Sequence, residues 1–299
     1  MKRRSMIAGP LLMLPIAARA DTVRLSLGQA SATLEIEGDA PPSTGSLIRR
    51  WIDRSAEAVI AYYGRFPVPE AYLHIIVTGG RGVRGGQSFP GAKPLVRVRV
   101  GAASTEDDLL HKDWVMVHEM VHLAFPWMNR RHNWMAEGLA VYVESIARVQ
   151  AGHLRPAQIW YDFVTMMPRG LPKPGEGGYD VTPTWGRTYW GGAIYCLLAD
   201  IAIRKATANA SGLQQALRAI NAQRDFRHEW DFRETLALGD AATGTRVLTE
   251  QYDAMRVEPV SPDLESLWAA LGVTLDGKTV VFDDTAPLAA IRLAIEAKA

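Results

Sequence analysis

Polar and apolar residues alternate in the first segment after residue 20. Val23, Leu25 and Leu27 occupy every second position, and Leu34 and Ile36 repeat this spacing. Successive side chains of an extended chain point to opposite faces, so these apolar residues share one face. The pattern predicts a hairpin of two half-buried strands within residues 21–39.

The next segments combine one helix with further strands. Residues 46–63 carry apolar side chains at the three- and four-residue spacing of an amphipathic helix. Residues 71–77 have the composition of a buried strand, and the strict alternation of residues 95–100 predicts an exposed or edge strand. Residues 79–86 are too rich in glycine for regular structure, and the alternatives for them are a mobile flap beside a site and a plain hairpin loop.

From residue 104 onward the periodicity is helical to about residue 255. Ser104 and Thr105 can cap a first helix that begins near Asp107, and a loop rich in Gly and Pro interrupts the helices at residues 168–183. Near the end of the sequence we expect two short strands joined by an Asp-Gly turn at residues 276–277, and then a helix over residues 287–298. Strands first and helices afterwards predict an α+β fold.

The first twenty residues have the order of a secretory signal peptide. Basic residues at positions 2–4 precede an apolar stretch at positions 6–17, and Ala18-Arg19-Ala20 forms a small-x-small cleavage motif. We therefore expect cleavage after Ala20 and an exported protein, periplasmic or secreted. The pair Arg3-Arg4 leaves the general secretory route and the twin-arginine route open as alternatives.

Charge and cysteine content argue against several classes of function. The sequence of 299 residues has 33 Lys and Arg against 32 Asp and Glu, a net charge of +1. This balance argues against a nucleic acid or an anionic membrane as partner, and no later stretch has the roughly 20 apolar residues of a membrane span. Cys196 is the only cysteine, so an internal disulfide is excluded, and its apolar neighbours predict a buried, inert thiol.

The sequence His118-Glu119-x-x-His122 carries the strongest chemical signal. Two histidines four positions apart lie on one face of a helix, so both imidazoles can bind one metal ion. Glu119 then projects beside them toward a water on that ion. The alternative for this motif alone is a pair of histidines that pack within a helix.

A second helix can complete a metal site. Asn133 can cap it, and Glu137 can supply a third ligand from a neighbouring antiparallel helix. Gly138 would let the two helices approach closely. Glu144 shares a face with Glu137, and it either orients a ligand histidine through its free ring nitrogen or lies on a solvated surface. Two histidines, one glutamate and an open position fit Zn²⁺ better than harder cations.

At these residues the chain resembles the gluzincin metallopeptidases, the thermolysin-like group with a His-Glu-x-x-His helix and a glutamate on the following helix. The pattern Trp134-x-x-Glu137-Gly138-x-Ala140-x-Tyr142 is similar to that of the alanyl-type and glycyl aminopeptidases. Residues 189–193, which read Tyr-Trp-Gly-Gly-Ala, and residues 198–204 resemble the tyrosine-bearing helix of the glycyl aminopeptidases.

The resemblance implies a thermolysin-like α+β fold and further residue roles. Tyr189 matches a tyrosine that helps to stabilise the transition state in those relatives, and Asp200 with Arg204 looks like a structural ion pair. We divide the chain into a β-rich N-terminal part of the catalytic domain (21–104), a helical catalytic part with the zinc site (105–260) and a C-terminal closing segment (261–299).

Two departures limit what the resemblance implies. The link between His122 and Glu137 is shorter than in the better-known aminopeptidases, so residues 126–132 must turn tightly. Where aminopeptidases carry a glutamate for the free amine of the substrate, residues 85–88 read Gly-Gly-Gln-Ser. Aminopeptidase specificity is therefore not carried over to this chain.

These residues predict an exported zinc-dependent hydrolase, and a peptidase acting on a peptide or protein is the leading interpretation. Zinc with three protein ligands leaves a position for the attacking water, whose proton Glu119 would accept, and Tyr189 would donate to the oxyanion. Residues 95–100 either bind a peptide as an added strand, as edge strands of the relatives do, or form an ordinary amphipathic strand. Two alternatives stay open: an inactive, zinc-stabilised peptide-binding module and a zinc hydrolase of non-peptide amides or esters.

Overall fold

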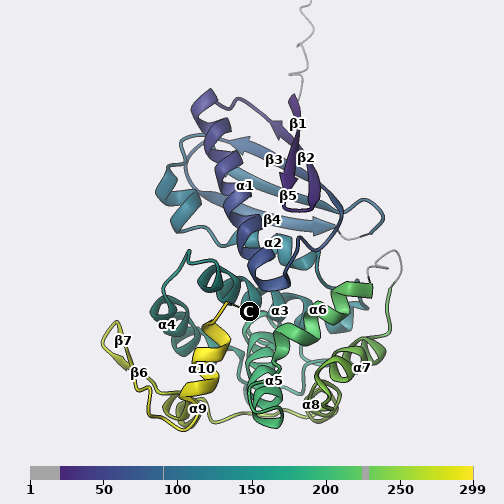
Figure 1. Cartoon of the computed structure of the whole chain (residues 1–299), viewed down its shortest axis with the longest axis vertical. Helices are drawn as coiled ribbons and strands as arrows, with labels where there is room; N and C mark the ends of the chain where they lie inside the picture. Colours follow the sequence, from purple (N-terminus) through teal and green to yellow (C-terminus); the bar gives the residue numbers. More distant parts are fainter. Residues whose placement is uncertain (1–20, 90, 224–228, 299) are drawn as a thin grey trace, which may run out of the picture.

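A computed structural model describes residues 21–89, 91–223 and 229–298. A β-sheet lies at one end of the molecule and a group of helices at the other, with the strands first in the sequence (Figure 1). The expected α+β class is thereby confirmed. The signal peptide expected in residues 1–20 lies outside the described residues and stays a prediction, as do the domain boundaries.

The main sheet has five strands in the order β1-β2-β3-β5-β4. They are β1 (Asp21–Leu27), β2 (Ala30–Glu37), β3 (Glu70–Thr78), β4 (Val83–Phe89) and β5 (Leu95–Gly101). β1 and β2 form the expected antiparallel hairpin, and β3 pairs in parallel with both β2 and β5. The buried strand expected at residues 71–77 is confirmed as β3.

The structure corrects two expectations about the sheet, the edge position of residues 95–100 and the irregularity of residues 83–86. β5 is not an edge strand, because β3 and β4 pair with it on either side. Its alternation has another cause, since Val96, Val98 and Val100 are buried on one face while Arg99 is exposed on the other. The glycine-rich segment is also regular from Val83 onward, where it forms the edge strand β4. Ladder pairing uses only backbone groups, so glycine weakens a strand without preventing it.

Helix α1 (Pro42–Tyr63) lies along the sheet and reaches down to the helical part (Figure 1). It begins earlier than the expected residue 46, with Pro42 in the first turn, where a missing N–H leaves no hydrogen bond unmade. Its apolar face, which includes Leu47, Ile48 and Trp51, is buried. The amphipathic helix predicted from the sequence is therefore confirmed.

The helix expected from Asp107 through His122 is divided in two. A single π-helical turn, η1 (Asp107–His111), is followed by a separate helix, α2 (Val115–His122). The break has a local cause, because the Asp113 carboxylate accepts hydrogen bonds from the backbone N–H groups of Val115 and Met116. Asp113 thus starts a new helix, α2, which lies between the sheet and the helical part (Figure 1).

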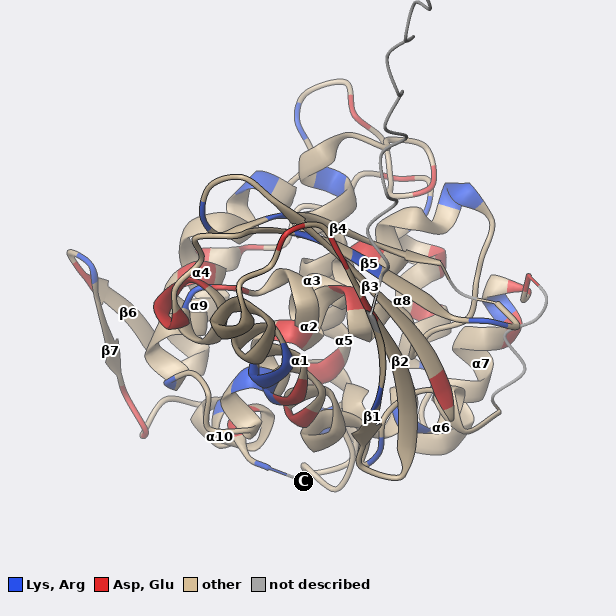
Figure 2. Ribbon diagram, turned by 90° about the horizontal axis from the view of Figure 1, so that it is seen from above, with Lys and Arg blue, Asp and Glu red and all other residues tan. Residues whose placement is uncertain are grey.

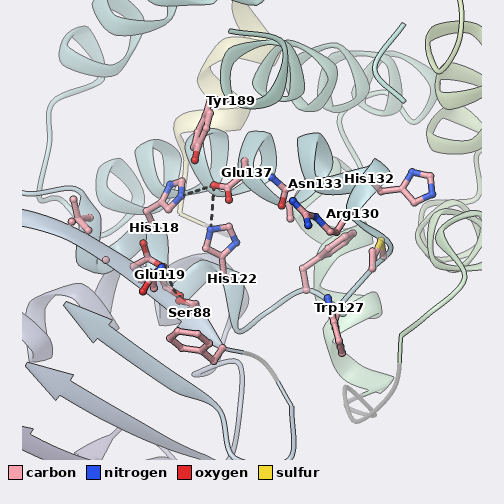
Figure 3. A pocket seen from close by; sticks show the side chains of 18 of the residues that line it. Ser88, His118, Glu119, His122, Trp127, Arg130, His132, Asn133, Glu137 and Tyr189 are labelled. Carbon is pink, nitrogen blue, oxygen red and sulfur yellow. Dashed lines mark hydrogen bonds and ion pairs between the residues drawn. The ribbon is translucent and has the colours of Figure 1, made fainter. Parts of the chain in front are cut away.

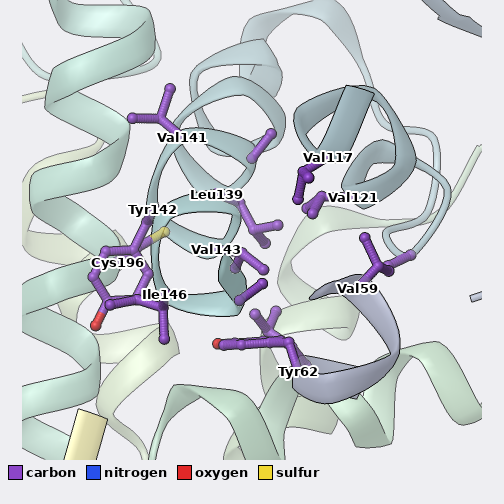
Figure 4. Close-up of a cluster of buried hydrophobic side chains, with 14 of the residues drawn as sticks. Val59, Tyr62, Val117, Val121, Leu139, Val141, Tyr142, Val143, Ile146 and Cys196 are labelled. Atoms are coloured by element: carbon purple, nitrogen blue, oxygen red, sulfur yellow. The ribbon is translucent and has the colours of Figure 1, made fainter. Parts of the chain in front are cut away.

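Helix α3 (Asn133–Gln150) forms the centre of the core, and every residue from Gly138 to Gln150 is buried. Figure 4 shows Leu139 and Val143 of α3 among side chains of α1, α2 and α5 (Gly192–Ala206). Cys196 of α5 lies in the same cluster, where burial raises the pKa of its thiol. The expectation of a buried, inert cysteine is consistent with this position.

Asn133 does not cap α3. It has helical dihedral angles, φ −57° and ψ −28°, and it follows directly on a 3₁₀ turn, η2 (Arg130–His132). The cap lies earlier, because Asn129 Oδ1 accepts a hydrogen bond of 3.2 Å from the backbone N–H of Arg131. The chain therefore turns toward α3 at Asn129.

The remaining helices surround α3 and α5 at the lower end in Figure 1. They are α4 (Pro156–Met166), α6 (Leu213–Gln223), α7 (Phe232–Thr243), α8 (Val247–Met255), α9 (Leu264–Leu271) and α10 (Ala289–Glu296), with short helical turns η3 (Met167–Gly170) and η4 (Arg187–Gly191). β6 (Val273–Asp276) and β7 (Thr279–Phe282) form the expected second hairpin. Within the described ranges, no helix is both long and apolar enough to span a membrane.

Charged residues of both signs are interspersed over the elements in Figure 2. This distribution agrees with the net charge of +1. Neither sign forms a continuous stripe along the elements drawn in this view.

Gly138 lies where α3 crosses α5, and we expect Gly138→Ala to lower the free energy of unfolding by about 1–3 kcal/mol. A Cβ atom at this position would lie 2.2 Å from the backbone of Gly192, which cannot move aside as a flexible side chain can. The sequence predicted that Gly138 allows a close approach to the helix of the histidines, but the close approach is to α5. Urea unfolding would measure the change. Gly45→Ala in α1 is the control, because nothing lies within 4 Å of its Cβ, and equal effects of the two substitutions would contradict this packing.

Candidate metal centre

Three side chains with metal-binding atoms meet between α2 and α3. Nε2 of His118 lies 3.2 Å from Oε2 of Glu137, and Nε2 of His122 lies 3.5 Å from the same oxygen. One ligand atom from each residue can be chosen so that all three lie within 4.8 Å of one another. Figure 3 shows both imidazoles turned toward the carboxylate. The structure therefore brings together the three residues that the sequence proposed as ligands.

The spacing and protonation of this group fit Zn²⁺. Ligand atoms about 2.0–2.1 Å from a tetrahedral zinc ion lie roughly 3.4 Å from one another, close to the separations of 3.2 and 3.5 Å between Glu137 and the two histidines. Burial acts to raise the pKa of Glu137, but the contacts with His118 and His122 outweigh it and bring the pKa to about 2. Burial lowers the pKa of His118. A neutral imidazole and an ionised carboxylate are the forms that bind a metal.

Glu144 does not orient a ligand histidine. Nδ1 of His118 is buried and has no hydrogen-bond partner among the described residues. Glu144 instead contacts Arg148 at 3.2 Å and accepts a hydrogen bond of 3.0 Å from Ser145. It is also buried rather than solvated, and burial raises its pKa to about 7. Both alternatives considered for Glu144 are therefore wrong.

Glu119 faces the edge strand β4, beside the histidines. Ser88 of β4 donates its hydroxyl to Oε2 of Glu119 at 2.8 Å, and the same hydroxyl lies 2.7 Å from the Glu119 backbone oxygen. A Cβ atom on Gly86 would lie 2.5 Å from Cγ of Glu119, so only glycine lets the strand approach this closely. Burial raises the pKa of Glu119. A carboxylate with a raised pKa is a better proton acceptor.

Tyr189 lies on the other side of the two histidines, in η4. Figure 3 shows its hydroxyl directed toward the space beside Glu137. Its ring stacks on Trp185, with ring centroids 5.9 Å apart. Burial raises the pKa of Tyr189, and the charges of Glu137 and Glu119 raise it further, so its hydroxyl keeps its proton. Tyr189 is thus a hydrogen-bond donor beside the candidate metal site.

A pocket of about 770 Å³ opens onto these residues. Its walls come from β4, α2, the segment between α2 and α3, the first turns of α3, and Tyr189. Phe89, Trp114 and Trp127 line it and are exposed, so the pocket has apolar surface near its opening. Trp134, in contrast, is buried and stacks on Tyr179, with ring centroids 4.6 Å apart. Trp134 therefore packs in the core and does not line the pocket.

The overall chain resembles M1 zinc metallopeptidases. It is similar to an aminopeptidase N family protein from Idiomarina loihiensis, with a TM-score of 0.63 and 12% identity over 86% of this chain and 50% of that chain. It is also similar to an M1 zinc metallopeptidase from Deinococcus radiodurans, with a TM-score of 0.52 and 15% identity over 81% of this chain and 53% of that chain. The chain has the fold of the gluzincin zinc metallopeptidases.

This likeness is one of structure. No family model matches the sequence, and no curated protein matches it. The chain spans about half the length of the solved structures it matches. The finer likeness to the glycyl aminopeptidases, which rests on residues 134–142 and 189–204, stays a prediction. Asp200 and Arg204 do form the expected ion pair, with 2.8 Å between Oδ1 and Nε.

Several pocket residues were missed in the sequence, among them Ser88, Arg130 and Asn133. The glycines of residues 79–86 were the available signal for Ser88, because glycine within a strand often marks a close backbone approach. Arg130 and Asn133 had no comparable signal. They line the pocket because of the turn that connects α2 to α3, and the sequence predicts only that this link is short.

Proposed function

We propose that the protein is an exported zinc-dependent hydrolase that cleaves peptide bonds. The observation that carries this proposal is the meeting of His118, His122 and Glu137 in one pocket with Glu119 and Tyr189. The gluzincin fold supports the same class of reaction. Export rests on the signal-like order of residues 1–20.

Each residue has a distinct part in the proposed reaction. His118, His122 and Glu137 would hold zinc, which lowers the pKa of a bound water and polarises a carbonyl. Glu119 accepts the proton of the attacking water, since its carboxylate lies beside the metal-binding imidazoles and is held by Ser88. Tyr189 then donates its hydroxyl to the negative oxygen that develops on the carbonyl.

A peptide would bind along β4. The outer edge of this strand pairs with no other strand in the described part of the chain, and most of β4 lines the pocket. An extended peptide can hydrogen-bond to such an edge as an added strand. A structurally similar M1 zinc metallopeptidase from Deinococcus radiodurans, with a TM-score of 0.51, has been solved bound to a Tyr-Ser-Ala substrate. The role considered for residues 95–100 is therefore proposed for β4.

The test is to incubate the mature, zinc-loaded protein with a mixed peptide library, with and without a chelator. We expect new termini at internal or terminal peptide bonds, and we expect the chelator to abolish them. Binding of peptides without cleavage would favour the inactive binding module. Cleavage of amide or ester substrates other than peptides, with an intact library, would favour a non-peptide hydrolase.

Tyr189→Phe is expected to lower kcat by about 10² to 10³ with little change in KM or zinc content. The substitution removes only the hydroxyl, and the stacking on Trp185 can persist. Steady-state kinetics of a fully zinc-loaded sample would measure the effect. Tyr161→Phe on α4 is the matched control, because Tyr161 does not line the pocket. A normal kcat with reduced thermal stability would instead make Tyr189 a packing residue.

A further inference from the structure

Arg130 presents a positive charge to the same pocket. It lines the pocket wall, and its side chain is exposed. In Figure 3, Arg130 lies next to Asn133, and His122 lies between Arg130 and Ser88. Within the described ranges, its guanidinium takes part in no hydrogen bond or ion pair, unlike Arg148 or Arg204, which hold carboxylates. The proposed reaction makes no use of this charge.

The backbone that carries Arg130 is fixed on both sides. Downstream, His132 contacts the Asp180 carboxylate at 3.2 Å and stacks on Phe232, with ring centroids 4.2 Å apart. Upstream, the carbonyl oxygen of Trp127 accepts a hydrogen bond of 3.0 Å from the backbone N–H of Trp230. Arg130 is therefore displayed from a rigid turn with its guanidinium left free, an arrangement that favours a ligand because little backbone entropy is lost on binding.

Arg130 is the charged residue of the pocket lining that is available to bind a charged group of the substrate. Glu119 and Glu137 are the acidic residues among the described lining residues, and the proposed reaction uses both. A third carboxylate, which could hold a substrate ammonium group, is absent from that set. Arg130 is the one Lys or Arg in the same set. Among the described lining residues, the pocket thus has a free cation for an anionic group and no free anion for a cationic one.

We propose that Arg130 determines specificity by binding a carboxylate of the peptide substrate. A guanidinium donates two parallel hydrogen bonds to a carboxylate, which no neutral amide of the same shape can replace. The carboxylate is either the C-terminus of the peptide or the side chain of an Asp or Glu near the cleaved bond. This inference rests on the proposed peptidase function, and it concerns the substrate class of that site.

Matched peptide pairs test the proposal. Each peptide of an alanine-based series carries Glu or Gln at one position in turn, and each is made with a free C-terminal carboxylate and as the amide. For the zinc-loaded protein, we expect kcat/KM to be about tenfold higher for the carboxylate member of the pair that reaches Arg130. The pair that shows the difference identifies the source, because terminal and side-chain carboxylates are varied separately.

Three variants assign the preference to Arg130. In Arg130→Gln, we expect the carboxylate and amide members of each pair to have nearly equal kcat/KM values. Arg130→Lys should keep part of the preference for the carboxylate, because lysine retains the charge without the planar guanidinium group. Arg131→Gln is the matched control, since Arg131 is exposed and does not line the pocket. A wild-type protein with no carboxylate preference, or an Arg130→Gln variant with an unchanged preference, would overturn the proposal.

A binding measurement separates this inference from the proposed function. Glu119→Gln protein, loaded with zinc, is titrated with the same peptide pairs by calorimetry. In one outcome, the wild-type protein cleaves no peptide, the Glu119→Gln protein binds the carboxylate members more tightly, and adding Arg130→Gln removes that difference. The peptidase proposal then fails and the role of Arg130 stands. If peptides are cleaved and bound without regard to their carboxylates, the peptidase proposal stands and the role of Arg130 fails.

Discussion

Replacing Glu119 with Gln is expected to lower kcat by about 10² to 10⁴ while leaving the fold and the metal content unchanged. The amide has the shape of the carboxylate and can still accept the hydrogen bond that Ser88 donates at 2.8 Å. It cannot take up the proton of an attacking water. The loss should therefore appear in the chemical step and not in substrate binding.

Zinc content, thermal unfolding and single-turnover kinetics would separate these effects. Glu265→Gln is a suitable control, because this glutamate is exposed on α9 and does not line the pocket. Ser88→Ala offers a further comparison, since it removes the hydrogen bond to Glu119 but leaves the carboxylate in place, and it should cause a smaller loss. Near-normal turnover in a fully loaded Glu119→Gln sample would remove the proposed base from the mechanism.

The part of the site that is local in sequence could be predicted. His118 and His122 lie on one face because the α-helical repeat places residues four apart above one another. Glu137 could be predicted as a third ligand because its helix follows the helix of the histidines after a short link. Both inferences need only the geometry of one helix and the nearness of the next. The structure brings these residues together as the sequence pattern requires.

The place of β5 within the sheet could not be predicted in the same way. The alternation of residues 95–100 reports which side chains of β5 are buried, and it contains no information on whether a further strand covers the outer edge. The further strand is β4, and few of its side chains are typical of a strand. Its pairing with β5 places the backbone of Gly86 next to Glu119. For this reason the sequence suggested residues 95–100, and not β4, as the edge strand open to a peptide.

Side-chain partners across the core were equally beyond the sequence. Glu144 lies seven residues after Glu137, which indicates a shared face but not which neighbours fill it. In the folded chain Glu144 is buried. Its carboxylate accepts a hydrogen bond from Arg148, one turn later on the same helix, and contacts no ligand histidine. The same limit applies to Arg130, whose exposure to the pocket depends on the anchoring of η2 by Asp180 and Phe232.

His122→Ala is expected to abolish stoichiometric zinc binding, with a loss of affinity of at least about a hundredfold. Loss of a residue that only orients a metal ligand typically costs 10- to 100-fold, and removal of a ligand costs more. His118 and Glu137 alone would leave two of the three protein ligands that a catalytic zinc site requires. Hydrolytic activity should fall with the metal and should not return when zinc is added at the concentration that saturates the wild-type protein.

Thermal unfolding gives a readout that does not depend on activity. A ligand that binds only the folded state stabilises it by about 4 kcal/mol at a free concentration 1,000 times its Kd, so zinc should raise the Tm of the wild-type protein. It should leave the Tm of His122→Ala nearly unchanged at the same concentration. His111→Ala serves as the control, because His111 is exposed and lies outside the pocket, and this variant should respond to zinc as the wild type does. If His122→Ala retains one zinc per chain and the full rise in Tm, then zinc binds elsewhere, and the group formed by His118, His122 and Glu137 is not the metal site.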